Sequence, residues 1–259
     1  MMRYIKIYLT CLRIAFSQAA AYRADFILGN IITLLSNTLF PLVTVVIYAN
    51  GASFPEWSMW EVLLIQSVFS TSTGLSAMIT SGVLWTTMDH IRDGSFEIVL
   101  LKPLSPLFYL TAVNFSTDSF GHFAGGLVLT IVSSVNTGAV TNGIPMFILL
   151  FIAGTAVLCG LNLIMAAISF KWVGNSRLPE IFDSINDFGK YPLGIFPKAL
   201  QIIAAFVIPV AVVGFFPASA LLGRLDPYML LAVIPCAVFL AFGVWLYDRM
   251  IKRYEGVGG

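Results

Sequence analysis

The chain has 259 residues, of which 58% are hydrophobic and only 10% are charged, and its formal net charge is +1. Soluble domains carry about one quarter charged residues, so a soluble fold of this composition would expose too much apolar surface to water. We therefore predict an all-α integral membrane protein in which residues 1–259 form a single transmembrane domain. Little length is left for a soluble catalytic or motor domain, and we expect no nucleic-acid partner.

The first 22 residues predict an amphipathic helix, over residues 2–22, that lies in the membrane interface. Basic and hydroxyl side chains recur there at steps of three and four residues, which places them on one helix face. These side chains are Arg3, Lys6, Thr10, Arg13 and Ser17. Cations on such a face can bind the anionic headgroups of membrane lipids on the cytoplasmic side. The alternative is an ordinary flank of the first span.

Six stretches are apolar enough to cross a bilayer core of about 30 Å, which needs roughly 20 residues of helix. We predict spans over residues 26–49, 60–84, 107–135, 144–170, 199–216 and 228–247. Trp57 and Trp60 suit the outer aromatic belt at the start of the second span. The turn-rich residues 136–143 separate the third span from the fourth. The expected fold is six transmembrane helices preceded by an interfacial helix.

The fifth span has an alternative register. In the preferred register, residues 179–189 form a short interfacial helix and the span follows at 199–216. In the alternative, residues 181–196 cross the membrane and residues 199–222 fold as a re-entrant hairpin on the outer side. This register has a cost, because charged side chains within the membrane are expensive. The charged residues that it would place there are Asp183, Asp187 and Lys190.

The distribution of Lys and Arg predicts that both termini are cytoplasmic, because cytoplasmic loops collect basic residues. In this orientation only Arg224 is outside, where it could pair with Asp226. The basic residues expected on the cytoplasmic side are Arg3, Lys6, Arg13, Arg23, Arg92, Lys102, Lys171, Arg177, Lys190, Lys198, Arg249, Lys252 and Arg253. We accordingly expect a multi-pass protein of the cell membrane with short outer loops and no extracellular receptor domain.

Small and hydroxyl side chains lie along one side of the second predicted span, where they would let another helix approach closely. The main members of this row are Ser67, Thr71, Gly74 and Met78. Gly121 and Gly125 form a G-x-x-x-G pair in the third predicted span. Two interpretations stay open: the small residues form a subunit interface or a pathway wall, or they pack helices within one subunit.

Asp118 and His122 are the titratable residues within a predicted span, and they lie one helical turn apart. An acidic residue beside a histidine inside a membrane suggests a proton or ion pathway. If the helix begins near Ser116, however, Asp118 lies at the cytoplasmic headgroups and the pair is structural. If it begins at Leu107, Asp118 lies near mid-membrane. We favour the interfacial position.

The cytoplasmic link at residues 85–106 is the most informative polar stretch. Its charged and turn-forming residues are Asp89, Arg92, Asp93, Gly94, Glu97 and Lys102. In a continuous helix the three carboxylates would form a row at steps of four, which is unfavourable unless a cation pairs with it. We expect Gly94 to interrupt the helix and Pro103 to end the helical segment after Gly94. A short acidic helix of this kind suits docking on a basic surface of a soluble partner; the alternative is a solvated loop.

These features together resemble the membrane subunit of a type-2 ABC exporter, in particular the permease group that often occurs as two related permeases with one ATPase. The matching motifs are Ile91-Arg92-Asp93-Gly94-Ser95-Phe96-Glu97, Leu100-Leu101-Lys102-Pro103-Leu104, Tyr191-Pro192, Ile208-Pro209 and Phe216-Pro217-Ala218. The resemblance covers essentially the whole chain. One departure is that the family usually has re-entrant helices before the last span, which the preferred register of span five does not provide.

The resemblance implies two permease subunits, identical or homologous, that contact two ATPase subunits through the link after the second span. It also implies that substrate passes between the permeases along spans two and five, where Phe206 and Pro209 join the row of small residues. The chain has no G-x-x-x-x-G-K-[ST] loop, so ATP and magnesium are expected on the partner ATPase. It also lacks the motifs of intramembrane hydrolases, so we do not expect an enzyme.

The sequence leaves other functions open. The chain could be a scaffold or sensor subunit without a pathway, and co-purification with an ATP-hydrolysing chain would distinguish the two. It could also be a proton-coupled secondary transporter that uses Asp118. The substrate is open, because a pathway lined by Ser, Thr, Phe and Met suits hydrophobic and amphipathic molecules of many kinds.

Overall fold

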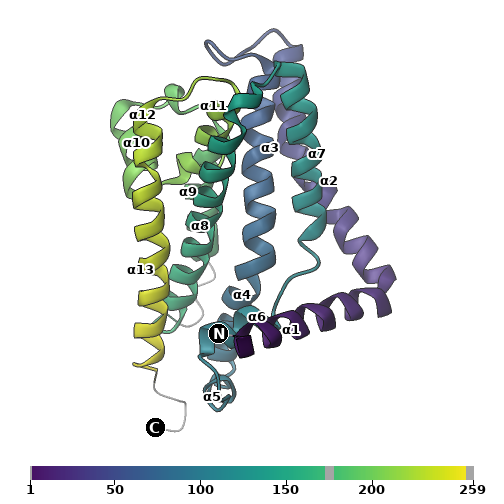
Figure 1. Ribbon diagram of the computed structural model, residues 1–259, viewed down its shortest axis with the longest axis vertical. Coiled ribbons are helices and arrows are strands. Elements are labelled where there is room, and N and C mark those ends of the chain that lie inside the picture. Colours follow the sequence, from purple (N-terminus) through teal and green to yellow (C-terminus); the bar gives the residue numbers. More distant parts are fainter. Residues whose placement is uncertain (1, 173–177, 255–259) are drawn as a thin grey trace.

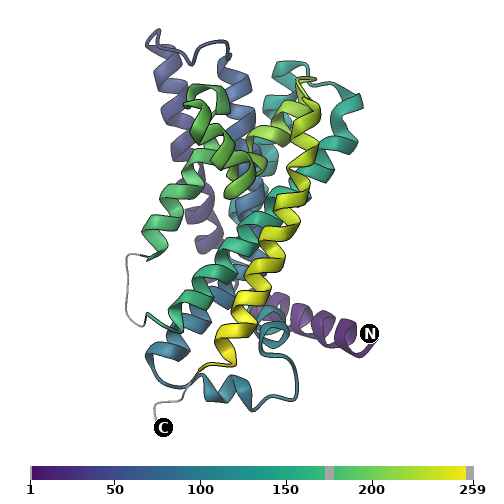
Figure 2. The same cartoon turned by 90° about the vertical axis from the view of Figure 1, so that its left-hand side faces the viewer.

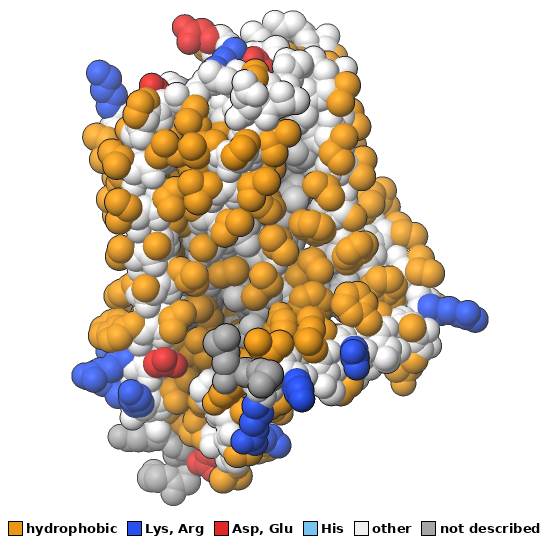
Figure 3. Space-filling view, viewed as in Figure 1, with side chains coloured by type: hydrophobic (Ala, Val, Ile, Leu, Met, Phe, Trp, Pro, Cys, Tyr) orange, Lys and Arg blue, Asp and Glu red, His pale blue; other side chains and the backbone are white. Residues whose placement is uncertain are grey.

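The computed structural model describes residues 2–172 and 178–254, and within these ranges all regular structure is helical (Figure 1). Four helices are long and apolar enough to cross a membrane, or five if one bent pair counts as a single span. The four are Arg23–Ala49, Met59–Arg92, Thr141–Ser169 and Pro227–Ile251. Figure 3 shows hydrophobic side chains over the middle of the molecule and charged side chains towards its two ends. This distribution is that of a multi-pass membrane protein.

Helix α1 (Met2–Ala21) lies across one end of the bundle, at a steep angle to α2 (Arg23–Ala49) (Figure 1). The predicted row of basic and hydroxyl side chains is exposed along α1. Aromatic contacts hold the helix against the bundle: the ring centroids of Tyr4 and Phe108 lie 4.9 Å apart, and those of Phe16 and Phe115 lie 6.1 Å apart. The structure therefore has a helix with an exposed cationic face across one end of the molecule.

The centre of the bundle is α3 (Met59–Ser76), which continues through a π-helical turn (Ala77–Ser81) into α4 (Gly82–Arg92). Helices α7 (Phe120–Thr137) and α8 (Ile144–Ser169) flank it, and α13 (Val233–Ile251) packs along α8. Glycines make the α8–α13 contact close, because a Cβ added at Gly243 would lie 2.8 Å from the carbonyl oxygen of Gly160. Close backbone approach of this kind is how helices associate in lipid.

The third predicted span, residues 107–135, is not one helix. The structure divides it into α6 (Pro106–Val113) and α7 (Phe120–Thr137), with non-helical residues between them. The cause is tertiary: the Ser116 amide donates to the carbonyl oxygen of Met78, 3.1 Å away, in the π-helical turn after α3. A long-range partner thus replaces the helical hydrogen bond that the local sequence would otherwise make.

The fifth predicted span, residues 199–216, is not straight. Helix α10 (Lys198–Ile202) and its π-helical extension to Val207 are bent by 77° relative to Val210–Leu221, which ends in α11 (Phe215–Leu221). The break falls at Pro209, which has no amide to donate.

Both ends of this bent segment lie near the same end of the bundle. Tyr191, which precedes it, packs against Phe54 in the loop between α2 and α3, with centroids 6.0 Å apart. At the other end, the Leu221 carbonyl accepts from the Val140 amide in the loop between α7 and α8, at 2.8 Å. The arrangement matches the alternative register, a re-entrant hairpin that follows α9 (Leu178–Asp187), as Figure 2 shows from the side. Lys190 contacts Phe40 and Phe69, and Lys198 begins α10, which lies away from the end that carries α1 (Figure 1). The prediction that these two lysines lie on the same side as the N-terminal helix is therefore wrong.

The end that carries these loops is held by an ion pair that differs from the predicted one. Arg224 lies 2.6 Å from Glu61, through Nη2 and Oε1, and stacks over the Trp57 ring at 4.9 Å. It does not pair with Asp226, which precedes the short helix α12 (Pro227–Leu231). Glu61 is available because it belongs to a capping box with Ser58 at the start of α3. One carboxylate therefore both caps α3 and binds the loop before α12.

Candidate functional site

The link at residues 85–106, which the sequence predicts to be cytoplasmic, includes the last turns of α4, which ends at Arg92. Gly94 has a φ of 66°, a left-handed conformation that favours glycine and stops the helix as predicted. Arg92 lies 3.0 Å from Asp89 and 3.3 Å from Asp93, so it pairs with two of the three carboxylates. Glu97 begins a separate short helix, α5 (Glu97–Leu100). The row of carboxylates that a continuous helix would form is therefore broken between Asp93 and Glu97, as expected from Gly94.

The link is anchored to the bundle by a buried aromatic cluster. The Phe96 side chain is completely buried, and its ring meets Phe170 at 4.9 Å and Tyr254 at 5.4 Å between centroids. Phe170 also packs on Tyr247 of α13, whose hydroxyl lies 2.8 Å from that of Thr87 in α4. The cluster joins the link to the ends of α8 and α13. Nothing in the sequence motif indicated that Phe96 is its central residue.

The opposite face of the link is exposed. Leu101 is 84% exposed and Ile98 is 56% exposed, beside the charged residues described above. Lys102 follows them and lies 5.9 Å from the centroid of the Tyr109 ring. Figure 1 shows α5 at the end of the bundle where α1 and the last turn of α13 also lie. The link thus exposes two aliphatic side chains and a mixed set of charges at that end of the bundle.

The predicted row of small residues on α3 packs within the chain. Ser67, Thr71, Gly74 and Met78 are all buried. A Cβ added at Gly74 would lie 2.6 Å from Phe123 Cα, and one at Gly126 would lie 2.6 Å from the Thr71 amide nitrogen. This is the interpretation in which the small residues let α3 and α7 approach within one subunit. Gly121 and Gly125 similarly face α2, at Asn30 and Leu34.

Phe206 and Pro209 are placed differently from that row. Phe206, on the π-helical turn Ile203–Val207, is 39% exposed, whereas Pro209 is buried at the bend of the hairpin. The structure therefore does not bring them together with the small residues of α3 on one common surface.

Asp118 and His122 are separated by the start of α7. Asp118 lies in the non-helical stretch before the helix, and among the described residues no ion pair joins it to His122. Their backbones instead contact α2: the Asp118 carbonyl accepts from Thr33 and the His122 carbonyl accepts from Asn37, at 3.2 Å. The His122 side chain lines a cavity, while Asp118 does not.

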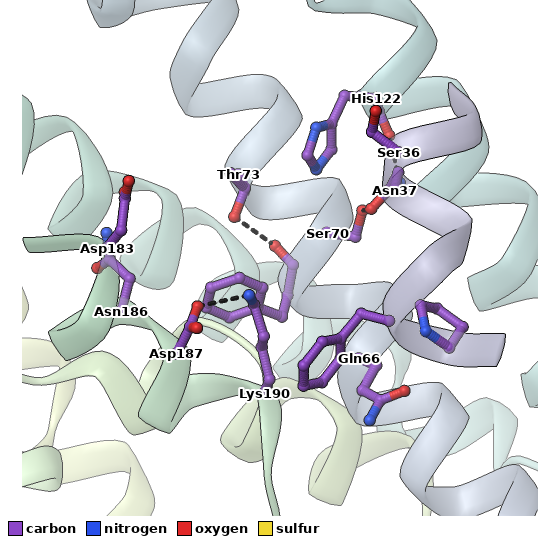
Figure 4. Close-up of a pocket in the computed structure, with 13 residues that line it drawn as sticks. Ser36, Asn37, Gln66, Ser70, Thr73, His122, Asp183, Asn186, Asp187 and Lys190 are labelled. Atoms are coloured by element: carbon purple, nitrogen blue, oxygen red, sulfur yellow. Dashed lines mark hydrogen bonds and ion pairs between the residues drawn. The ribbon is translucent and has the colours of Figure 1, made fainter. Parts of the chain in front are cut away.

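That cavity has a volume of about 400 Å³ and lies between α2, α3, α7 and α9 (Figure 4). Its polar lining residues come from all four elements and the turn after α9: Ser36, Asn37, Gln66, Ser70, Thr73, His122, Asp183, Asn186, Asp187 and Lys190. Phe40, Pro41 and Phe69 supply the apolar walls. The preferred sequence register hid this site, because it kept α9 in the interface. The signal was the alternative register, which brings the same charged residues into the membrane.

Lys190 is the cation of the cavity. Its Nζ lies 2.5 Å from Asp187 and sits over the rings of Phe40 and Phe69, at 4.7 and 5.5 Å from their centroids. Gly189 lets the turn pack closely on α3, because a Cβ there would lie 2.7 Å from the Val210 carbonyl oxygen and 3.0 Å from the Phe69 ring. The other wall is a hydrogen-bonded surface, in which the Ser70 hydroxyl donates to Asn37. Among the described residues no group of three or more His, Cys, Asp or Glu side chains could hold a metal ion.

The fold is that of an all-helical, multi-pass membrane protein. Residues 32–258 match the family profile described as ABC-2 family transporter protein. Since the match covers most of the chain, this protein belongs to that family and is a permease, a component that lacks ATPase activity. The comparison with curated proteins finds no match.

Proposed function

We propose that this chain is the permease subunit of an ATP-driven exporter that moves a hydrophobic or amphipathic substrate across the cell membrane between two permease subunits. Two ABC ATPase subunits would hold ATP and magnesium and dock on the link. The second permease would be identical or homologous. Membership in the ABC-2 transporter family supports the class. The observation that carries the coupling is the anchored link, with Phe96 buried and Leu101 exposed.

The contacts of the link suit the transmission of force. Helix α4 continues α3 through the bundle, so a push on Asp89 or Arg92 acts directly on the central helix. The Phe96 cluster adds a second route, to the ends of α8 and α13. Closure of the ATPase dimer would then tilt three helices together and open the interface between the permeases outward.

We further propose six membrane crossings with both termini in the cytoplasm. The crossings beyond the four long helices would be α6 with α7, and the segment from α9 to Phe196, which are too short or too irregular to count as single apolar helices. Helix α1 contacts α6, and its exposed basic face would bind anionic lipids on the same side as the link. In this scheme the bent segment from Lys198 to Leu221 does not cross the membrane.

Substitutions in the link test the coupling. Asp93→Lys reverses an exposed charge, and Gly94→Val opposes the left-handed backbone at the helix end. We expect both variants to insert and to bind the ATPase weakly, so that ATP hydrolysis by the co-purified complex no longer drives export in proteoliposomes. The matched control is Asp226→Lys, an exposed charge reversal at the opposite end of the molecule. Normal export by the Asp93 and Gly94 variants would overturn the proposal.

The scaffold alternative makes a different prediction. A subunit that only assembles a complex has no need of an ATP-hydrolysing partner, so it would purify without ATPase activity. Loss of Leu101, by Leu101→Ser, would then leave the complex intact. The exporter proposal expects this exposed side chain to be needed for stable association with the ATPase, as measured by the subunit ratio after purification.

A further inference from the structure

The cavity described above lies deep along the central helix. Ser70, in its wall, is roughly 16 Å from Met59 at the start of α3, at ~1.5 Å per residue, which is about half of a 30 Å bilayer core. The opposite wall is formed by α9 and the turn after it. Polar side chains at such a depth are expensive, and their usual justification is a pathway or a ligand.

The charges of the cavity do not balance among the described residues. Lys190 pairs with Asp187, at 2.5 Å, whereas no ion pair is present for Asp183 one helical turn earlier. With a neutral histidine, the lining groups Asp183, Asp187 and Lys190 therefore carry one net negative charge. Asp183 is exposed, so its carboxylate is accessible to a cation that the described residues do not supply.

A second feature points to a hydrogen-bond donor. The side-chain oxygen of Asn186 is buried and has no hydrogen-bond partner in the described structure. Asn186 and Asp183 stand next to each other on the α9 wall, as Figure 4 shows, and both line the cavity. A buried acceptor without a donor costs free energy, so a ligand that brings N–H groups would satisfy both side chains at once.

The chain itself shows that this cavity accommodates an ammonium group. The Lys190 ammonium is held by a carboxylate and by the faces of Phe40 and Phe69. These are the two kinds of group that recognise amines: an anion and an aromatic face. The apolar lining consists of these two rings and Pro41, which suits a short aliphatic body, and a volume of about 400 Å³ is within the range of small-molecule sites.

From these observations we propose that the cavity binds the ammonium head of an amphipathic amine, with Asp183 as its anionic anchor and the Asn186 oxygen as its second acceptor. The inference rests on the proposed transport function and deepens it, because it assigns the substrate class. A ligand headed by a carboxylate or phosphate is disfavoured, since Asp183 would repel it and Lys190 is already paired. A neutral alcohol of the same length would lack the charge that Asp183 requires.

Binding of octylammonium to the full chain in lipid nanodiscs tests the proposal, with empty nanodiscs measuring simple partition into lipid. Isothermal titration is expected to show saturable binding of octylammonium and none of octanoate or octanol. Asp183→Asn keeps the shape of the side chain and removes its charge, and it should weaken binding by about tenfold, as expected when a charge-assisted hydrogen bond is lost. Asp226→Asn, outside the cavity, should leave the affinity unchanged.

A variant with the opposite expected effect guards against a general loss of structure. Lys190→Met removes the internal ammonium and frees Asp187, so it should strengthen octylammonium binding severalfold. Equal affinity in wild type and Asp183→Asn, saturable binding of octanoate, or weakened octylammonium binding in Lys190→Met would each overturn the inference. No ATPase takes part in this measurement, so its failure is distinguishable from failure of the coupling. Conversely, Asp93→Lys should bind octylammonium like wild type even when export is lost.

Discussion

Truncation of Phe96 should release the link at residues 85–106 from the bundle while leaving its sequence motif almost intact. The ring is fully buried and makes edge-to-face contacts with Phe170 and Tyr254. Replacing a buried Phe by Ala costs about 3–5 kcal/mol in a packed core. At ~1.4 kcal/mol per factor of ten, the lower figure corresponds to a population of the open link roughly 100-fold larger.

Hydrogen exchange of the link amides measures this opening. The amides of Val99 and Leu101 donate within the short helix α5, and their protection depends on the docking of that helix. We expect their exchange in Phe96→Ala to accelerate by about 100-fold, with ATP hydrolysis uncoupled from export. Phe120→Ala, which removes an exposed ring, is the matched control. Unchanged protection of the link amides in Phe96→Ala would refute the role assigned to the cluster.

Three pairs of variants test the close helix packing, a buried hydrogen bond and the capped ion pair, each by thermal unfolding in detergent. Gly121→Ala should destabilise by about 1–3 kcal/mol because the new Cβ would overlap the Asn30 carbonyl oxygen and lie 2.8 Å from Thr33 Oγ1. Gly29→Ala, which meets nothing within 4 Å, should be neutral or stabilising, and equal effects of the two variants would contradict the close α2–α7 approach. Tyr247→Phe should cost about 1–3 kcal/mol by leaving the buried Thr87 hydroxyl unpaired, and Tyr228→Phe, at an exposed ring, should cost less than half of that. Glu61→Gln keeps the capping geometry and loses the ion pair with Arg224, and it should cost at most about 1 kcal/mol because exposed pairs are weak. A larger loss would show that this pair is stronger than expected. Ser58→Ala removes the cap and should cost about 1 kcal/mol.

Local features of the sequence identified much of the framework. The exposed cationic face of α1, the helix stop at Gly94 and the close packing of small residues all follow from spacing and backbone chemistry. The class of protein followed from apolar length together with the motifs of the link. These features depend on neighbours within a few residues, which a single sequence displays directly.

The features that were missed depend on distant partners. The break before α7 accompanies a hydrogen bond from the Ser116 amide to the Met78 carbonyl oxygen, and no local sequence pattern predicts that bond. The cavity was hidden for a similar reason. Charged residues in α9 look misplaced in a membrane until Phe40 and Phe69 are seen to surround Lys190. The pairing of Arg224 with Glu61 instead of its near neighbour Asp226 is a third case.

The unbroken path from Met59 to Arg92 makes the central helix a lever arm. Its 34 residues span about 51 Å at ~1.5 Å per residue, so a tilt of about ten degrees would carry one end roughly 9 Å relative to the other. The π-helical turn at Ala77–Ser81 divides this arm, and the Ser116 amide is fastened there. With a fulcrum at Met78, the arm towards Arg92 would be about 21 Å long and the arm towards Glu61 about 26 Å, at ~1.5 Å per residue. A movement at the link would then reappear at similar size and in the opposite direction beside the Glu61–Arg224 bridge.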